Sequence, residues 1–399
     1  MAFRTTTLRD NSILSDLIRR PTAAAVVAKF FGKLATYDLI LLGAVFTLVA
    51  FGLISLFSTT QPELTNFYKQ FLWLVLGLAV FFTVSAFDYR FFRVHSIPAL
   101  LFYAIGSLGV VGVLLFGTTI RGAKSWIDLG FFNIEPVELV KIALILILAK
   151  YFSMRHAEIY RFRHIFISGI YVAIPALLVL MQPDAGSFTI LVVIWGGMVL
   201  VSGIRLRHIL VLALAAFGFF SLAWQFLLLA YQKARLAAFI NPAGDPLGAA
   251  YNSIQAKVAV ISGGLFGKGL GQGTQTQLGF LPEAQTDFIY AALAEELGIL
   301  IAVIILVLFG VIFWRLARIC VSTTNNFARL SILGIAIMIM AQFTLNVGMS
   351  IGILPVTGVT LPFVSYGGSS LIALFLALGI VQSIYRFSSQ TTPGHYEIS

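Results

Sequence analysis

Charged residues are scarce in this chain. They make up 11% of its 399 residues, hydrophobic residues make up 59%, and the mean hydropathy is +0.97. Soluble domains carry about 25% charged residues. The composition therefore excludes a soluble or disordered protein and predicts a polytopic membrane protein.

Cysteine is almost absent as well. Cys320 is the single cysteine, which excludes an intrachain disulfide and a cysteine-based metal cluster. A cleaved signal peptide is not expected, because the first apolar run starts only near Tyr37 and no small-residue cleavage site follows it.

Basic residues outnumber acidic ones, with 26 Lys and Arg against 16 Asp and Glu, for a net charge of +10. They are scattered between apolar runs rather than clustered on a polar domain. This distribution favours membrane orientation over nucleic-acid binding. No nucleic-acid partner is expected.

Long apolar runs fill most of the chain. A spanning helix needs about 20 apolar residues, and the sequence contains ten candidate runs, near 37–58, 70–86, 95–116, 137–153, 164–181, 188–203, 208–230, 288–314, 329–353 and 366–386. We predict an all-α polytopic membrane protein with about ten transmembrane helices and one large loop, 231–287, between the seventh and eighth. The expected organisation is an N-terminal tail (1–35), one membrane domain (36–387) and a C-terminal tail (388–399).

The distribution of Lys and Arg predicts the orientation. The side of the two termini carries 18 of the 26, the opposite side carries 7, and Lys141 lies inside a helix. The positive-inside rule then places both termini in the cytoplasm and 231–287 outside, with a stretch at Ser12–Lys33 on the anionic inner leaflet. Connections 117–136, 182–187 and 352–370 share that outer side, where no ATP or NAD is available.

Asp287 enters the eighth apolar run directly after Thr286. One interpretation is a first-turn carboxylate that favours the helix dipole, with Thr286 as the N-cap. The other is a general base, because partial desolvation raises a carboxyl pKa toward the working pH and suits it to accept a hydroxyl proton.

Two further charge groups face the same outer side. Glu138 and Lys141 are spaced to pair on one helix, so they form either a structural ion pair or part of a polar cavity shared with Asp287. Arg121 and Lys124, beside Trp126, either bind a phosphate group or anchor the chain at the headgroups; the residues alone favour the anchor.

Two glycine-rich stretches are less specific. The segment Gly263–Gly273 lacks the Walker A and Rossmann patterns, so we predict a flexible loop or tight turn rather than a phosphate cradle. In the segment Val364–Ser370, the hydroxyls of Ser365 and Ser369 could cap the last helix, and the glycines could admit a ligand or pack closely.

Together the motifs resemble the SEDS family (shape, elongation, division and sporulation), from about Tyr37 to Arg386. The motifs that carry the resemblance are Arg121-Gly-Ala-Lys-Ser-Trp-Ile-Asp-Leu-Gly130, Pro136-x-Glu138-x-x-Lys141, Gln182-Pro-Asp-x-Gly186, Asn241-Pro-x-x-Asp245-Pro-x-Gly248, Leu281-Pro-Glu-Ala-x-Thr-Asp287-Phe-Ile, Glu295-Glu-Leu-Gly298 and Pro362-Phe-x-Ser-Tyr-Gly-Gly-Ser-Ser370. Asp245-Pro-Leu-Gly and Ala294-Glu-Glu-Leu-Gly lean toward the elongation, RodA-like branch.

The resemblance implies a peptidoglycan glycosyltransferase of the bacterial cytoplasmic membrane. It would polymerise lipid II on the outer face, with undecaprenyl pyrophosphate as the leaving group and a class B penicillin-binding protein as the crosslinking partner. The family's essential acid falls on Asp287. The substrate-binding residues we expect are Arg121, Lys124, Glu138, Lys141, Gln255, Lys257, Glu283, Ser365 and Ser369. No cofactor is expected; a divalent cation could share the neutralisation of pyrophosphate, but the sequence shows no dedicated cage for one.

The chain departs from the family pattern at two positions. Gln285 stands where the family often has His, which puts a histidine partner for Asp287 in doubt. Glu135 stands where the family often has Gln, which adds a negative charge.

Two other classes of function remain open. A lipid II flippase would need polar residues that continue to the inner leaflet, whereas here they crowd the outer half. A non-catalytic scaffold that recruits a transpeptidase would tolerate substitution of Asp287.

Overall fold

The computed structural model describes residues 36–60, 63–120, 123–128, 130, 133–155 and 162–389. The predicted N-terminal tail with its amphipathic stretch, Arg121 and residues 390–399 lie outside that part of the chain. Contacts divide the chain into residues 1–39 and residues 40–399, and the second unit includes all the candidate site positions.

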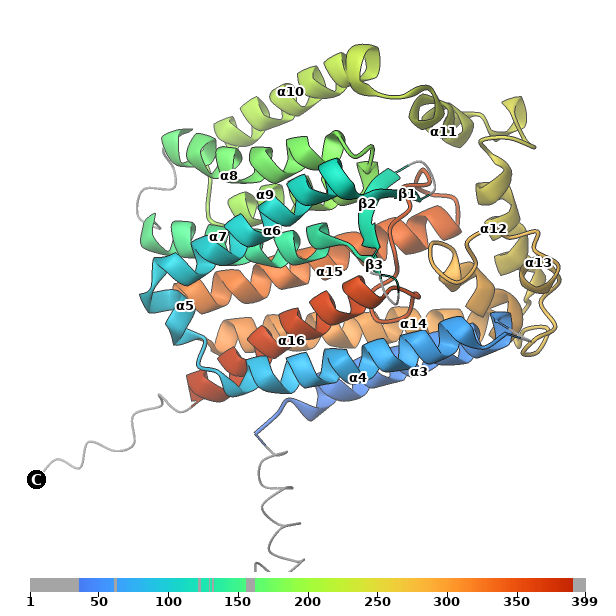
Figure 1. Cartoon of the computed structure of the whole chain (residues 1–399), viewed down its shortest axis with the longest axis horizontal. Helices are drawn as coiled ribbons and strands as arrows, with labels where there is room; N and C mark the ends of the chain where they lie inside the picture. The colour runs from blue at the N-terminus through green and yellow to red at the C-terminus, as the bar shows by residue number, and fades with distance from the viewer. Residues whose placement is uncertain are drawn as a thin grey trace, which may run out of the picture. The chain divides into compact units, whose positions relative to one another are not determined.

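Each predicted apolar run forms a helix (Figure 1). These helices are α3 (Leu39–Thr59), α4 (Thr65–Ala86), α6 (Ser96–Phe116), α7 (Pro136–Arg155), α8 (Phe162–Leu180), α9 (Ala185–Val201), α10 (Leu206–Leu222, continued by the π-helix η1, Ala223–Leu227), α14 (Ile289–Ser322), α15 (Asn326–Ser350) and α16 (Gly368–Ser389). Among the described residues, eight spans are long and apolar enough to cross a membrane. The two remaining helices are α7 and the shorter α9, which has 17 residues. The prediction of an all-α polytopic membrane protein is confirmed.

Helix α7 is the most enclosed of these helices. It packs against α6, α8, α9 and α15, and it is buried almost continuously from Pro136 to Ala149. A helix that is apolar on all sides belongs in the interior of a bundle. Helix α10, in contrast, exposes large apolar side chains such as Leu214 and Phe217, as expected of a helix that faces lipid.

The segment between α10 and α14 is largely helical rather than a plain loop. It contains α11 (Ala230–Ile240), the 3₁₀ turn η2 (Pro242–Gly244), α12 (Tyr251–Ser262) and α13 (Thr274–Gln277). Helix α12 buries Ala256 and Ala259 against α14. Its small residues permit that close packing. Because it is less hydrophobic than the spanning helices, the pattern of apolar runs did not predict it.

A small antiparallel sheet replaces the loop expected at 117–136. Strands β1 (Thr118–Ile120), β2 (Ala123–Asp128) and β3 (Asn133–Ile134) pair in that order, with Thr118 opposite Trp126 and Ile127 opposite Ile134. Strand β3 leads directly to Pro136, the first residue of α7. Strands this short leave little periodic signal in a sequence.

The polar connections gather at one end of the helix bundle, which we call the sheet end: β1–β3, α12, α13 and the start of α14. Figure 1 shows these elements together, opposite the short helix α5 (Arg90–Val94). The turn at Gln182 joins them, since the Lys124 N–H donates to the Gln182 carbonyl (3.2 Å) and the Gln182 amide donates to the Val110 carbonyl (2.9 Å).

Candidate active site

Asp287 lies at the sheet end, just before the first helical residue of α14. Its backbone carbonyl accepts a hydrogen bond from the Asn346 amide of α15 (2.8 Å), which also donates to the Val359 carbonyl (2.8 Å). The preceding carbonyl, of Thr286, accepts from the Ser365 hydroxyl (2.6 Å). The backbone that carries the carboxylate is therefore held from two sides by buried side chains.

The helix-cap interpretation of this site fails in one respect. Helix α14 begins at Ile289 with Phe288 at the N-cap, so Thr286 is not the N-cap. The Thr286 hydroxyl donates instead to the Glu283 carboxylate (3.0 Å). Glu283 has a φ of 56°, because the tight turn before Asp287 demands a left-handed residue there.

An apolar cluster supports the residues on either side of Asp287. Its buried members are Ala256, Ala259, Leu281, Phe288, Ala291, Ala292 and Met349. They come from α12, the turn before Asp287, α14 and α15. Close packing of this kind restricts movement of the short turn.

Glu138 and Lys141 form the predicted ion pair. Lys141 Nζ lies 2.8 Å from Glu138 Oε1, and both side chains are buried. Lys141 also lies within electrostatic range of Glu135 and Asp184. The structure therefore shows the ion pair of the first interpretation, and a polar cavity shared with Asp287 stays a prediction.

Glu135 links that pair to Asp287. Burial is the main cause that raises the pKa of the Glu135 carboxyl well above its usual value, followed by the carboxylates of Glu138 and Asp184. The Lys141 ammonium offsets part of this rise, and Asp287 adds to it. Asp287 thus lies within electrostatic range of Glu135.

Ser365 and Ser369 make internal hydrogen bonds. Ser369 accepts from the Glu135 N–H (3.0 Å) and donates to the Asn133 carbonyl (3.1 Å), which ties the start of α16 to the entry of α7. Ser365 holds the carbonyl before Asp287, as described above. Both serines therefore position carboxylate-bearing backbone.

A cavity of about 280 Å³ is lined in part by residues 281–286 of the turn before Asp287. Its lining is largely neutral and polar: Thr59, Asn66, Thr276, Leu281, Glu283, Ala284, Gln285, Thr286 and Tyr366. Gln285 occupies the position of the family's histidine. The side-chain oxygen of Gln285 accepts a hydrogen bond from the Asn66 side-chain amide (3.0 Å). The side-chain NH₂ of Gln285 donates to the Thr59 backbone carbonyl (3.3 Å).

The family model described as "Cell cycle protein", for FtsW, RodA and SpoVE, matches residues 33–390 of the chain. The chain belongs to the FtsW/RodA/SpoVE family. This is the SEDS family that the sequence motifs resemble.

Curated members of the FtsW/RodA/SpoVE family are similar over most of the chain. Stage V sporulation protein E of Bacillus subtilis is 36% identical over 368 residues, which cover 89% of this chain and 99% of that protein. Peptidoglycan glycosyltransferase MrdB of Escherichia coli K12 is 42% identical over 294 residues, 73% of this chain and 79% of that protein.

Solved structures of family members have the same fold. A chain in a structure described as the structural coordination of polymerization and crosslinking by a peptidoglycan synthase complex superposes with a TM-score of 0.75 at 31% identity, covering 89% of this chain and 99% of that one. The Rod shape determining protein RodA of Thermus thermophilus superposes with a TM-score of 0.66 at 31% identity, covering 88% and 97%.

The remaining predicted residues of this SEDS protein lie around the site in different ways. Lys124 Nζ donates to the Leu114 carbonyl (2.8 Å) at the end of α6, so its ammonium caps that helix. Gln255 and Lys257 lie on α12, where the Lys257 stem passes close to Gly352. Within the described part of the chain, no group of three or more His, Cys, Asp or Glu is arranged to hold a metal ion.

Sequence reasoning missed Asn346, which is fully buried and fastens the Asp287 carbonyl. A signal was present, because an amide inside the apolar run of α15 requires a partner. Its partners lie 59 and 13 residues away along the chain, so the sequence could not name them.

Proposed function

We propose that Asp287 is the general base of lipid II polymerisation. The chain is a peptidoglycan glycosyltransferase. The observation that carries the proposal is that the backbone of Asp287 is held by the buried side chains of Asn346 and Ser365, next to a turn that lines a largely polar cavity. A base must be held in place to act on one hydroxyl, and this arrangement holds it.

In the proposed step, Asp287 accepts the proton of the acceptor sugar's 4-hydroxyl. That oxygen forms a bond to the anomeric carbon of the donor glycan while the bond to undecaprenyl pyrophosphate breaks. The electron pair leaves with the pyrophosphate, and the anomeric centre develops oxocarbenium character as in other glycosyl transfers.

Cations would stabilise the departing pyrophosphate. Arg121 and Lys124 remain our candidates from the sequence. Lys124 would have to exchange its contact with the Leu114 carbonyl for the phosphate, and its long flexible stem makes that exchange feasible. Lys257 and Lys141, with Glu138, are further candidates for the substrate's charged part.

The cavity suits a sugar. Amide and hydroxyl groups dominate its lining, and burial raises the pKa of the Tyr366 phenol, so the phenol remains a neutral donor. Glu283 would repel a phosphate from this side. We place the glycan here and assign the pyrophosphate to Arg121 and Lys124, with Gln255 of α12 a further candidate for the substrate.

The proposed setting is the outer face of the bacterial cytoplasmic membrane, with both termini inside. A class B penicillin-binding protein is the proposed partner, and membrane lipids surround the helices. The likeness to a chain of a peptidoglycan synthase complex supports a crosslinking partner.

A flippase receives less support. Beyond Lys141, residues Ile142–Ala149 of α7 are apolar and buried, so α7 offers no polar path toward the other end of the bundle. A scaffold requires that Asp287 be dispensable, which the following experiment tests.

The test compares polymerisation of lipid II by the purified full-length protein with its cognate transpeptidase present. Asp287→Asn should lower kcat by about 100- to 10,000-fold, the usual worth of a general base, with lipid II binding retained. Glu63→Gln, which alters an exposed carboxylate at the start of α4, is the matched control and should be unaffected. Wild-type rates from Asp287→Asn would remove Asp287 from the base role.

A further inference from the structure

Helix α14 is broken just after the site, at Gly298. This residue has φ 86° and ψ 171°, so the helix consists of two parts, 289–297 and 299–322. The short first part is the one that adjoins Asp287. The direction of that first part, and with it the position of Asp287, depends on what holds the break.

The glycine-rich segment 263–269 fills the break. The N–H groups of Lys268 and Gly269 donate to the carbonyls of Glu295 and Glu296 (3.0 and 2.9 Å). Across the break, the N–H groups of Ile299 and Leu300 donate to the carbonyls of Gly264 and Leu265 (2.9 and 3.3 Å). The segment thus supplies the hydrogen bonds that an unbroken helix would make itself.

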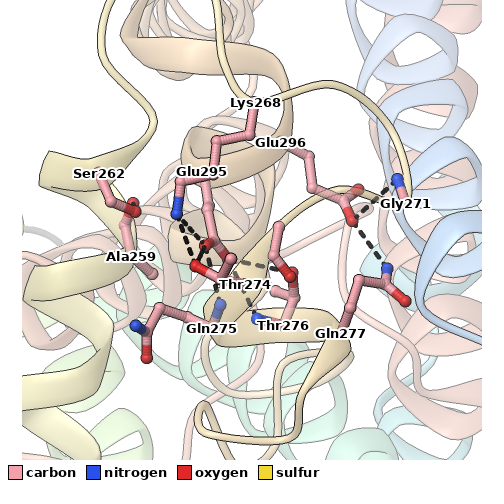
Figure 2. Close-up of polar contacts among 11 residues, drawn as sticks. Ala259, Ser262, Lys268, Gly271, Thr274, Gln275, Thr276, Gln277, Glu295 and Glu296 are labelled. Carbon is pink, nitrogen blue, oxygen red and sulfur yellow. Dashed lines mark hydrogen bonds and ion pairs between the residues drawn. The ribbon is translucent and has the colours of Figure 1, made fainter.

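Two adjacent glutamates of the first part are completely enclosed, with 0% exposure for Glu295 and 1% for Glu296. Figure 2 shows that they reach in different directions, Glu295 toward Lys268 and α13 and Glu296 toward Gly271 and Gln277. Buried carboxylates are costly unless donors surround them. These donors come from segments outside α14.

Both oxygens of Glu295 accept hydrogen bonds. Oε1 accepts from Lys268 Nζ (2.9 Å) and the Gln275 N–H (2.9 Å), and Oε2 accepts from the Thr276 N–H and hydroxyl (3.1 and 3.0 Å). The Thr274 hydroxyl also lies 3.3 Å from Oε1. Glu295 therefore needs two acceptor atoms.

The contacts of Glu296 within the described residues reach one oxygen only. Oε1 accepts from the Ser58 hydroxyl of α3 (2.8 Å), the Gln277 amide (3.0 Å) and the Gly271 N–H (3.3 Å). Glu296 therefore needs a single acceptor atom, and it joins α3, α13 and α14.

We propose that Glu295 and Glu296 are positioning residues for Asp287: they lock the first part of α14 to the 263–277 segment and to α3, and so fix where the carboxylate stands. The proposal rests on Asp287 being the general base. It assigns a task to the glycine-rich segment, which binds helix α14 rather than a phosphate.

The two glutamates should respond differently to the same substitution. Glutamine has one acceptor and one NH₂ group, so Glu295→Gln must point NH₂ at the N–H of Gln275 or of Thr276 and leave that N–H unbonded. Glu296→Gln can keep its oxygen at the Oε1 position and all three donors. The change in charge acts in the same sense, because Glu295→Gln also removes the carboxylate that pairs with Lys268, whereas the donors to Glu296 are neutral.

The first measurement is the kinetics of lipid II polymerisation. A misplacement of about 1 Å can cost about 100-fold in rate, so we expect Glu295→Gln to lower kcat by that order with KM for lipid II nearly unchanged. Glu296→Gln should stay within about threefold of wild type, whereas Glu296→Ala, which removes the acceptor, should lose activity as Glu295→Gln does.

The second measurement needs no activity. With Cys320, the single cysteine, replaced by serine, Asp287→Cys places one thiol at the site, and its rate of maleimide labelling reports its exposure. Glu295→Gln should change this rate and Glu296→Gln should not. If Glu295→Gln cannot be purified in a folded form, Ser58→Ala takes its place. Ser58→Ala removes one donor to Glu296, and we expect a smaller change in the labelling rate, in the same direction.

The outcomes are distinguishable. A changed labelling rate with unchanged kcat supports the positioning proposal and contradicts the base role of Asp287. Unchanged labelling and unchanged kcat in Glu295→Gln overturn the positioning proposal, as does an equal loss in both glutamine variants.

Discussion

Each enclosed carboxylate of this protein has its own partner set. Glu138 pairs with Lys141, Glu295 pairs with Lys268 (2.9 Å) among several donors, and Glu296 is held by neutral donors. Removing one partner of a buried pair costs about 3–5 kcal/mol. Substitutions that remove one member of the buried Glu138–Lys141 pair are therefore expected to destabilise the protein.

Glu135 differs, because its surroundings disfavour its charged form. The folded protein retains the Glu135 proton to a higher pH than the unfolded chain does. Stability should therefore fall as pH rises from the unfolded pKa through the raised folded pKa.

We expect Glu135→Gln to remove this part of the pH dependence, since glutamine has no proton to lose. The variant should match wild type at acid pH and become the more stable of the two as pH rises. Thermal unfolding of the full-length protein in detergent, from about pH 4 to about pH 8, would measure the difference across the range of carboxyl titration.

The exposed carboxylate Glu63 serves as the control, and Glu63→Gln should follow the wild-type curve. Parallel curves for wild type and Glu135→Gln would show that Glu135 is ionised in the folded protein as readily as in the unfolded chain.

At the scale of elements, α14 consists of two helical parts, and the backbone of segment 263–269 makes the hydrogen bonds that bridge the break between them. A Cβ at Gly298 would collide with the Leu265 carbonyl, and one at Gly267 (φ 82°) with the Glu296 carbonyl. The close approach of segment 263–269 to the break in α14 therefore explains why both Gly267 and Gly298 are glycine. Hydropathy shows a single long apolar run here and no break.

Gly298→Ala should destabilise the protein. Its φ and ψ lie in a region essentially reserved for glycine, which costs other residues about 1–3 kcal/mol, and the collision with Leu265 adds to that. The measurement is the thermal midpoint in detergent, together with the yield of folded protein.

Gly310→Ala is the matched control on the same helix. A Cβ at Gly310 meets nothing within 4 Å, so alanine should be neutral or stabilise by up to about 1 kcal/mol. Equal midpoints for the two variants would contradict a strained break at Gly298.

At the scale of the whole molecule, α14 spans the bundle from the sheet end to its opposite end. Phe266, at the sheet end, is 82% exposed, and Val321, at the far end of α14, is 78% exposed. These two positions provide a direct test of orientation.

In a background with Cys320 replaced by serine, Phe266→Cys should react with a membrane-impermeant maleimide in intact cells. Val321→Cys should react only after permeabilisation, because the positive-inside rule places its end in the cytoplasm. The reverse pattern would invert the proposed topology and move the site to the cytoplasmic face.

Much of the site was visible in the sequence because charge inside an apolar run is itself a signal. Asp287 and the Glu138–Lys141 pair were found in this way, and the pair's geometry is confirmed. The roles of Ser365 and Ser369 were not predictable, since their hydroxyls bond to backbone groups of other segments. The bond from Ser58 to Glu296 joins residues 238 apart in the chain.

The sequence by itself determined the membrane-spanning architecture, the family and the carboxylate proposed to do the chemistry. Hydropathy and motif spacing are local properties that add along the chain, so they need no tertiary information. Only the tertiary structure decided where α14 breaks, what fills the break and which buried donors hold Asp287 in place. Those features depend on hydrogen bonds and close approaches between distant segments, which exist only once the helices have packed.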